Sequence, residues 1–475
     1  MKKILVVLLF AFGTSFFNYC GAQYRDLHNF NGTNGGTPVG GSLTLIGTGL
    51  YGMTAYNAAH NFGCLFLLDT NGSGYKDLFD FNYTDGAEPN GTFTVSGKRL
   101  FGMTFAGARL LDGSIFSVDT NGRGYSNLHN FDLEFIGHAP YPQASLALSQ
   151  GVLYGMTQQG GTNGDGNIFS VDTNGFSYTD IFDFNDTNGK SPYGAVIISG
   201  RVLYGMTSNG GTFGYGNIFS IKIDTNGMGI GYKDLLDFNG TNGASPSGSL
   251  IIAGRRLLGM TPNGGVSGNG NIFAIDTDGT RYKDLYDFSG TPSCSCPNGD
   301  LLLVGQRLYG VTENGGPYGV GTIFVIDTDG SRYMDLYDFN SANNNGAVPI
   351  GSLIYSGHTL YGMTSGGGSN GYGVIFSFDD ISVGINELTG AKEAMNVYPN
   401  PNNGVFTLQA NGQQLMANSH IEVDNVLGTK VYSQFSTLNS PLSINLSNQP
   451  NGVYLYRVIT EDGNIVGEGK LIIQK

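Results

Sequence analysis

The sequence predicts an all-β protein: a seven-bladed β-propeller of four-stranded blades, followed by a small Ig-like β-sandwich. Two observations lead to this fold class. Three short patterns each recur seven times at intervals of 50 to 54 residues, and fixed periods of this size are typical of solenoids and propellers. Glycine accounts for 77 of the 475 residues while aromatic residues reach 12%, which favours packed β-structure with tight turns over a disordered glycine-rich chain.

The three patterns mark the same positions in every repeat. The first is Gly-Met-Thr or Gly-Val-Thr, with its glycine at Gly52, Gly102, Gly155, Gly205, Gly259, Gly310 and Gly362. The second is an aliphatic residue followed by Phe66, Phe116, Phe169, Phe219, Phe273, Phe324 or Phe376. The third is Tyr-x-Asp/Asn-Leu/Ile, which begins at Tyr24, Tyr75, Tyr125, Tyr178, Tyr232, Tyr282 and Tyr333.

Each repeat resolves into four short strands. In the fifth unit these are 249–253 (SLIIA), 256–261 (RLLGMT), 271–276 (NIFAID) and 282–288 (YKDLYDF). Gly254 and the run Thr277-Asp278-Gly279 are residues that tolerate the positive φ of hairpin turns. Four antiparallel strands per repeat is the composition of a propeller blade, and no segment shows a helical period.

The phase of the repeat predicts how the ring closes. The last unit has strands at 352–356, 360–364 and 374–378 but lacks the fourth. The orphan fourth strand stands at the other end of the chain, at 24–30 (YRDLHNF). An open array would leave two raw sheet edges, which promote aggregation. We therefore expect the N-terminal strand to complete the last blade of a propeller over residues 23–382.

The repeats also resemble a known family. The run G-x-x-LYG-x-T-x-x-GG-x-x-G-x-G-x-(I/V)-F-x-x-D-x-x-G is similar to the GloVer tandem repeats of secreted bacterial proteins, and it covers all seven units. The resemblance implies little about function, because that family is recognised by its repeats and by varied C-terminal anchors.

The N-terminus has the layout of a secretory signal peptide. Lys2 and Lys3 precede an apolar run from Ile4 to Phe12 and then a small-residue site ending at Ala22. The run is too short to span a bilayer, and no other apolar run approaches 18 residues. We expect cleavage after Ala22, which makes residues 1–22 the signal peptide and predicts no transmembrane segment. A lipoprotein site at Cys20 is the alternative.

The periodicity ends near residue 382, and 383–394 is predicted to be a linker. Residues 395–475 alternate strand-like segments with Asn, Gly and Pro turns, which predicts a small sandwich. This part closely resembles the type A C-terminal sorting domain of the type IX secretion system of Bacteroidota; an unrelated accessory sandwich is the alternative. The matching positions are Pro399, Asn400, Pro401, Gly428, Gly452, Tyr454 and Lys470. The resemblance implies that the type IX machinery is a partner and that the protein reaches the cell surface or the medium through the periplasm.

Charge and residue types exclude several kinds of site. A net charge of −14 and a pI near 4.7 argue against binding nucleic acid. The repeated D-T-(N/D)-G runs, such as Asp276-Thr277-Asp278, could begin calcium loops, but the same residues make hairpin turns, which we favour. The histidines show no metal-ligand spacing, and Cys64, Cys294 and Cys296 cannot build a disulfide framework. We expect neither metal nor cofactor.

Catalysis would require carboxylates that face each other across a cleft. The acids that break the repeat are Glu88, Asp112, Glu134, Asp165 and Glu313. They lie on loops of different blades, and nothing in the sequence shows that two of them converge. We therefore predict no catalytic residue. A glycoside hydrolase or lyase acting on extracellular polysaccharide remains the alternative.

Binding has the better geometric case. In an antiparallel blade the long loops between blades and the long loops between second and third strands emerge on one face. On this long-loop face six aromatic residues replace glycine or polar residues of other repeats: Tyr56, Phe105, Phe213, Tyr215, Tyr318 and Tyr372. Such rings suit stacking on sugars or cradling a peptide, or they pack on neighbouring loops. We expect a monomeric, non-catalytic propeller that binds an extracellular glycan or protein; a purely structural surface component is a third possibility.

Overall fold

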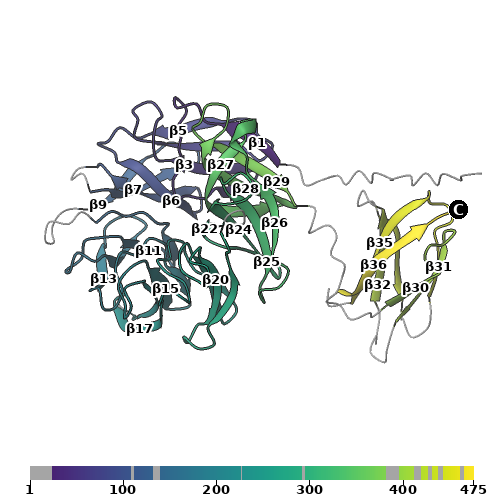
Figure 1. The fold of residues 1–475 in the computed structure, drawn as a ribbon. Helices are drawn as coiled ribbons and strands as arrows, with labels where there is room; N and C mark the ends of the chain where they lie inside the picture. Colours follow the sequence, from purple (N-terminus) through teal and green to yellow (C-terminus); the bar gives the residue numbers. More distant parts are fainter. Residues whose placement is uncertain are drawn as a thin grey trace, which may run out of the picture. The chain divides into compact units, whose positions relative to one another are not determined.

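The computed structural model describes residues 24–475 except 109–111, 132–139, 226, 291–294, 381–394, 411–418, 426–429, 437–441 and 461–464. The predicted signal peptide and linker lie outside these residues. The chain divides into two compact units at residue 381. Their regular structure is strand throughout, apart from one short 3-10 helix, η1 (Ser341–Asn343) (Figure 1). The described residues are therefore all-β, as predicted.

Seven sheets make up the described part of the first unit, and six of them are each built from one stretch of chain. The first sheet contains β2 (Thr44–Ile46), β3 (Gly49–Thr54), β4 (Cys64–Asp69) and β5 (Lys76–Asp80). The second contains β6 (Ala87–Ser96), β7 (Arg99–Ala106), β8 (Ser114–Asp119) and β9 (Ser126–Asn130). The third contains β10 (Ala147–Ser149), β11 (Val152–Thr157), β12 (Asn167–Asp172) and β13 (Thr179–Asp183).

The fourth to sixth sheets repeat this order. The fourth contains β14 (Ile197–Ser199), β15 (Val202–Thr207), β16 (Asn217–Ile223) and β17 (Gly229–Asp237). The fifth contains β18 (Ile251–Ala253), β19 (Arg256–Thr261), β20 (Asn271–Asp276) and β21 (Lys283–Asp287). The sixth has five strands, β22 (Ser295–Pro297), β23 (Leu302–Val304), β24 (Arg307–Asn314), β25 (Thr322–Asp327) and β26 (Met334–Asp338).

Both ends of the repeat region contribute to the seventh sheet. Its order is β1 (Tyr24–Asn29), β29 (Val374–Asp379), β28 (Thr359–Gly367) and β27 (Gly346–Ser356), and Figure 1 shows β1 beside β29. β1 pairs antiparallel with β29, with Tyr24 opposite Phe378 and the register shift after Asp26. The same shift occurs between third and fourth strands of the other sheets.

Two of the sequence patterns turn out to be cross-strand partners. Gly52 of β3 lies opposite Phe66 of β4, and the same glycine–phenylalanine register recurs in every sheet. A Cβ atom on Gly52 would lie 2.3 Å from the Phe66 ring. The glycine is needed because the phenylalanine ring of the next strand occupies the space of its side chain.

The third pattern joins neighbouring sheets. Tyr75 stacks on His28 of the seventh sheet, with ring centroids 3.8 Å apart and planes inclined by 3°. Equivalent stacked pairs across sheet boundaries are Tyr125–Phe79, Tyr178–His129, Tyr232–Phe182, Tyr333–Tyr286 and Tyr24–Tyr337. A buried cluster that includes Phe30, Leu50 and Ile375 joins the seventh sheet to the first. The sheets are therefore propeller-like blades that pack face to face through aromatic rings.

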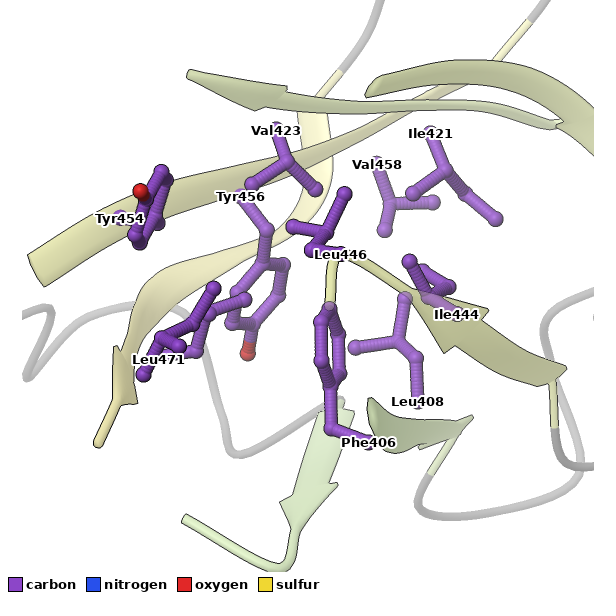
Figure 2. Close-up of a cluster of buried hydrophobic side chains, with 11 residues drawn as sticks. Phe406, Leu408, Ile421, Val423, Ile444, Leu446, Tyr454, Tyr456, Val458 and Leu471 are labelled. Atoms are coloured by element: carbon purple, nitrogen blue, oxygen red, sulfur yellow. The ribbon is translucent and has the colours of Figure 1, made fainter. Parts of the chain in front are cut away.

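The second unit consists of two sheets. One contains β30 (Met395–Tyr398), β31 (Val405–Ala410) and β34 (Leu442–Asn445); the other contains β33 (Lys430–Ser436), β32 (Ser419–Asn425), β35 (Gly452–Thr460) and β36 (Ile465–Ile473). Figure 2 shows apolar side chains of both sheets meeting in one core, among them Phe406, Ile421 and Val458. Buried residues alternate with more exposed ones over 405–409 of β31 and 453–458 of β35, as expected of sheets with one buried face.

No helix in the described part of the chain has the length and apolar character required to cross a bilayer.

A candidate binding site lined by all seven repeats

One cavity of about 450 Å³ is lined by residues of every repeat. Its lining residues precede the first strand of a sheet, as Thr37 and Gln143 do, lie in the early part of a long first strand, as Asn90 of β6 and Ile350 of β27 do, or stand at the end of the second strand, as Glu313 does. These places lie toward the long loops, since the second strand runs back to the side where the first began. The cavity volume falls within the range of about 300–1,000 Å³ that is usual for small-molecule sites.

The same strained turn leads into the cavity in every repeat. A residue with φ between 49° and 56° precedes a proline at Thr37, Glu88, Tyr141, Ser191, Ser245, Cys296 and Val348. This left-handed conformation is rare for residues with a side chain, and least favourable for β-branched Thr37 and Val348. Backbone hydrogen bonds to the preceding repeat hold it, such as Ser245 N–H to Tyr215 O at 2.9 Å and Thr37 N–H to Tyr372 O at 2.8 Å. Backbone strain maintained in this way is often found at binding sites.

Five residues after Thr37 and four residues after the equivalent turn residue of the other repeats, side-chain oxygens form hydrogen bonds between neighbouring repeats. The backbone N–H at this position donates to the side chain of the next repeat, as in Thr92 N–H to Ser145 Oγ at 2.8 Å, except at Ser145, whose next neighbour is Ala195. These bonds also cross the junction of the chain ends, where Ser352 N–H donates to Ser42 Oγ at 2.6 Å. We call Ser42, Thr92, Ser145, Ser249, Asp300 and Ser352 the hydroxyl ring, although Asp300 takes part through its carboxylate. In the fourth repeat the position is Ala195, which has no side-chain oxygen.

Glycines just before the hydroxyl ring let the repeats approach closely. A Cβ atom on Gly248 would lie 2.1 Å from the carbonyl oxygen of Gly299, and one on Gly351 would lie 2.2 Å from that of Gly41. A side chain at either glycine would collide with the neighbouring backbone, so this close approach requires glycine there. The third repeat has Ala144 at this position.

The residue after each proline varies from repeat to repeat on this repeated backbone. We call these seven residues the variable ring, and all of them line the cavity: Val39, Asn90, Gln143, Tyr193, Ser247, Asn298 and Ile350. Six residue types occupy seven equivalent places, while the flanking proline and glycine hardly change. Sequence reasoning missed these residues, although the repeated X-Pro-x-Gly run would have revealed them.

Hydrogen bonds orient the polar members of the variable ring. Gln143 Nε2 donates to Gln158 Oε1 at 2.6 Å, and Gln158 Nε2 donates to the Tyr193 hydroxyl. Asn90 and Asn298 each accept from the N–H of the glycine that follows, at 2.7 and 2.9 Å. Because these bonds use the carbonyl oxygen of the asparagine side chain, its NH2 group is left as the donor. Asn298 Nδ2 lies 3.4 Å from Glu313 Oε2.

The charge of the cavity has one sign. Asp300 and Glu313 are the charged residues of its described lining, which contains no lysine, arginine or histidine. A negatively charged ligand would meet repulsion without a compensating cation, so the cavity suits neutral or positively charged ligands.

The structure leaves most of the predicted aromatic residues on the surface. Tyr56, Phe213, Tyr215, Tyr318 and Tyr372 are between 39% and 57% exposed. Tyr372 also packs against Gly32 of the loop before the first sheet. Phe105 differs, because it is only partly exposed and stacks on Tyr141 with centroids 4.7 Å apart. None of the six lines the cavity; five stand outside the strands, and Phe105 is near the end of β7.

The acids singled out in the sequence have separate surroundings, but the expectation that all lie on loops of different blades is wrong. Glu88 is in β6 and Asp112 stands between β7 and β8 of the same sheet, while Glu313 is in β24. Glu88 accepts from the Tyr56 hydroxyl at 3.3 Å, and Asp165 pairs with Lys190 at 2.8 Å. Asp112 is buried. Glu313 lines the cavity, and Glu134 lies outside the described residues.

The turn aspartates bond mostly within their own turns. Asp172 Oδ1 accepts from the N–H groups of Asn174 and Phe176, and Asp276 Oδ2 pairs with Arg281 at 2.6 Å. Hydrogen bonds from its own turn lower the pKa of Asp172 below its usual value. A role in hairpin turns therefore accounts for the contacts of these aspartates in the D-T-(N/D)-G runs.

Cys64, Asp77 and Asp80 are the described residues whose ligand atoms lie close enough together to hold a metal ion. Burial raises the pKa of the Cys64 thiol, and burial together with Asp80 raises the pKa of Asp77 to about 6. Both shifts favour the protonated forms and so oppose metal binding. In other repeats an asparagine, such as Asn167 or Asn271, stands at the position of Cys64. This indicates that Cys64, Asp77 and Asp80 have a structural role.

In the second unit the predicted motif gathers at the last strand. Asn400 accepts from Ile472 N–H at 2.8 Å and donates to Lys470 O at 3.1 Å. Pro399 and Pro401 flank it, both after cis peptide bonds. Tyr454 is buried and donates to Pro450 O at 2.8 Å, and Gly452 pairs with Ile473. Gly428 lies outside the described residues.

Comparison with solved structures finds distant likeness. The chain is 14% identical to the extracellular domain of a one-component system from B. thetaiotaomicron, with a TM-score of 0.48, covering 95% of this chain and 58% of that one. It is 11% identical to a puromycin-hydrolyzing peptidase of Mycobacterium tuberculosis, with a TM-score of 0.49, covering 83% of this chain and 63% of that one. It is 12% identical to an oligogalacturonate lyase in complex with manganese, with a TM-score of 0.44, covering 75% of this chain and 93% of that one. The chain thus spans about six tenths of the first two.

Comparison with curated proteins finds no match.

Comparison with family models identifies both units. The model of the Gloeobacter/Verrucomicrobia repeat matches residues 12–219, 96–261 and 203–420. The model of the secretion system C-terminal sorting domain matches residues 396–474, which marks the protein for export to the cell surface or beyond. The chain therefore belongs to the Gloeobacter/Verrucomicrobia repeat family and carries a type IX sorting domain at residues 396–474.

Proposed function

We propose that this protein is an exported, non-catalytic glycan-binding protein. In this proposal the first unit is a closed seven-bladed propeller, the second is an Ig-like sandwich read by the type IX machinery, and the central cavity holds one end of an extracellular glycan. The observation that carries the proposal is the variable ring, in which seven different repeats place their own side chains in one cavity on a repeated backbone turn.

Contacts at the junction of the chain ends support closure. Tyr24 stacks on Tyr337 at 4.4 Å, as its counterparts do between sheets of continuous chain. The hydroxyl ring and the glycine contacts also continue from residues 351–352 to residues 41–42. A closed ring gives the cavity its complete wall.

The chemistry of the cavity favours a sugar over a protein surface. It is concave, and it presents amide, hydroxyl and phenol groups that suit the hydroxyls of a saccharide. The exposed rings Tyr215, Tyr318 and Tyr372 stand on the surrounding loops, where further sugar units could stack.

The placement of the acids supports binding without catalysis. The two carboxylates in the described lining, Asp300 and Glu313, belong to the same repeat. The Asp300 carboxylate already accepts the Ser249 N–H. Hydrolysis by a carboxylate pair needs two acids on opposite sides of the scissile bond.

A glycan array probed with the full chain, followed by titration of each hit, tests the proposal. Tyr193→Ala and Gln143→Ala should each weaken binding about tenfold or more, because each removes an oriented polar group. Phe176→Ser, on a hairpin turn that does not line the cavity, is the matched control and should leave affinity unchanged. A blank array, or full affinity in both cavity variants, would refute the proposal.

The same ligands decide between binding and turnover. We expect bound glycans to be recovered intact after long incubation. Product release that disappears in Glu313→Gln while affinity persists would favour the enzyme instead.

A further inference from the structure

The variable ring has two unlike sides. Val39 and Ile350 are its aliphatic members, and they come from the first and seventh repeats. These repeats are neighbours, because Gly351 lies against Gly41 and Ser352 donates to Ser42. Two aliphatic side chains therefore stand side by side in an otherwise polar ring. We call them the apolar arc.

The other five members form a continuous polar arc from the second to the sixth repeat. It offers the NH2 groups of Asn90 and Asn298 and the hydroxyl of Tyr193 as donors, and Gln143 Oε1 and the Ser247 hydroxyl oxygen as acceptors, because the Ser247 hydroxyl itself donates to Asn298 Oδ1 at 3.4 Å. The side chain of Gln158 ties Gln143 to Tyr193 across two repeats, so this part is held in place before any ligand arrives. A ligand with hydroxyls all around would leave some of them against the apolar arc without a partner.

A ligand matched to both arcs carries hydroxyls on one side and a small apolar group on the other. The carboxylates of Asp300 and Glu313, with no cation in the described lining, disfavour sugars that bear a carboxylate or a sulfate. Resting on the proposed function, we propose that the cavity selects a neutral sugar that bears an apolar methyl group, on C5 as in a 6-deoxy sugar or at the end of an acetamido group as in an N-acetylamino sugar, with the methyl against Val39 and Ile350.

Burial explains the size of the expected preference. One methyl group in an apolar pocket gives about tenfold discrimination, and a hydroxyl forced against the same surface loses its hydrogen bonds with water. We therefore expect the methyl-bearing member of a matched pair to bind at least about tenfold more tightly.

The experiment titrates the full chain with two matched pairs of free sugars: L-fucose against L-galactose, and N-acetylglucosamine against glucose. Wild-type protein should prefer the methyl-bearing member of at least one pair about tenfold. Glucuronate should bind more weakly than either glucose or N-acetylglucosamine.

The variants use side chains that other repeats already carry, so the backbone should tolerate them. Val39→Ser copies Ser247, and Ile350→Asn copies Asn298. The double variant should reduce the preference to less than about twofold while retaining affinity for the hydroxylated member. Ser247→Val, in the polar arc, is the matched control and should not increase the preference.

The outcomes separate the two proposals. If the protein binds sugars with equal affinity for both members of each pair, or if the double variant keeps the preference, the selection of a methyl group is wrong while the glycan-binding function stands. Tighter binding of glucuronate also overturns the charge argument. If no sugar binds, both proposals fail.

Discussion

The seventh sheet and the other six differ in how the chain supplies them. Six sheets come from single stretches, whereas β1 reaches the seventh from the opposite end of the repeat region. Yet the register, the bulge and the stacked tyrosine of β1 match those of the continuous fourth strands. Side-chain contacts between and within sheets therefore specify where a strand belongs, and chain connectivity is not required.

Deleting Tyr24–Phe30 is the largest test of this comparison. The seventh sheet would lose its outer strand, and the first sheet would lose its packing on Phe30, which is fully buried. Truncation of a single buried phenylalanine costs roughly 3–5 kcal/mol, so we expect the deletion to cost more than about 5 kcal/mol in chemical denaturation.

A rearranged chain sharpens that test. Moving residues 24–30 behind Asp379 through a short Asp-Gly hairpin turn would make the seventh sheet continuous, as the others are. We expect the rearranged chain to recover most of the lost stability. Recovery below half, or an unchanged unfolding midpoint in the simple deletion, would show that β1 does not act as a fourth strand.

Tyrosine substitutions compare the junction directly with an interior boundary. Tyr24→Leu at the junction and Tyr125→Leu between the first and second sheets each remove one stacked pair across the boundary, one stacked pair within the sheet and one hydrogen bond of the phenol oxygen. The stacking is worth about 0.5–1.5 kcal/mol and the hydrogen bond about 1 kcal/mol. Each variant should lose about 2 kcal/mol of unfolding free energy. A much smaller loss for Tyr24→Leu would mean that the junction is looser than the interior boundary.

His28 makes the junction sensitive to acid. Burial lowers the pKa of His28 to about 4, whereas an unfolded histidine titrates near 6.5. The unfolded state therefore takes up the proton first, and the stability that His28 contributes is lost as the pH falls from about 6.5 toward 4.

His28→Phe, which copies Phe79 and Phe182, should remove this loss. We expect the variant to gain roughly 1 kcal/mol relative to wild type at pH 5 and little at pH 8, after allowance for the partial exposure of His28. Asp77 and Asp180 act with the opposite sign, since burial raises their pKa to about 6 and acid stabilises their folded form. Asp77 and Asp180 are present in both proteins, so their contribution cancels when the unfolding free energy of wild type is subtracted from that of His28→Phe at each pH. If the unfolding free energies of wild type and His28→Phe changed with pH in parallel, the prediction would be wrong.

The smallest effect concerns the one described boundary without a stacked pair. Tyr282 faces Leu236 in the place where Tyr232 has Phe182. Leu236→Phe should restore the pair and stabilise the protein by about 0.5–1 kcal/mol. Phe176→Ser, on a hairpin turn of the third sheet, is the control and should leave the stability unchanged, because Phe176 is 88% exposed. A loss of stability in Leu236→Phe would mean that the leucine fills a space too small for the ring.

Much of the fold could be predicted because repetition makes local signals reliable. The patterns of glycine, phenylalanine and tyrosine gave the four strands of each repeat, and the missing last strand predicted the pairing of β1 with β29. The fifth strand of the sixth sheet, β22, was not predicted, because Ser295–Pro297 shows no strand pattern and pairs with β24 only through its position in space.

The site was predicted only in part. Tyr56, Phe213, Tyr215, Tyr318 and Tyr372 are on the surface, as expected of binding residues, but the cavity lies elsewhere. Glu313 was noticed as an acid, and its position in the cavity could not be seen from one sequence.

By itself the sequence determined the all-β class, the four-stranded repeat, the sorting domain and the partner of the first strand. These follow from hydrophobic alternation, from the residues at the turns and from the number of strands in each repeat, all of which can be read along the chain. Only the tertiary structure decided which of the many varying positions face each other. The seven residues after the prolines are about 50 positions apart in the sequence, and they meet only because close contacts between glycine backbones bring every repeat to one axis.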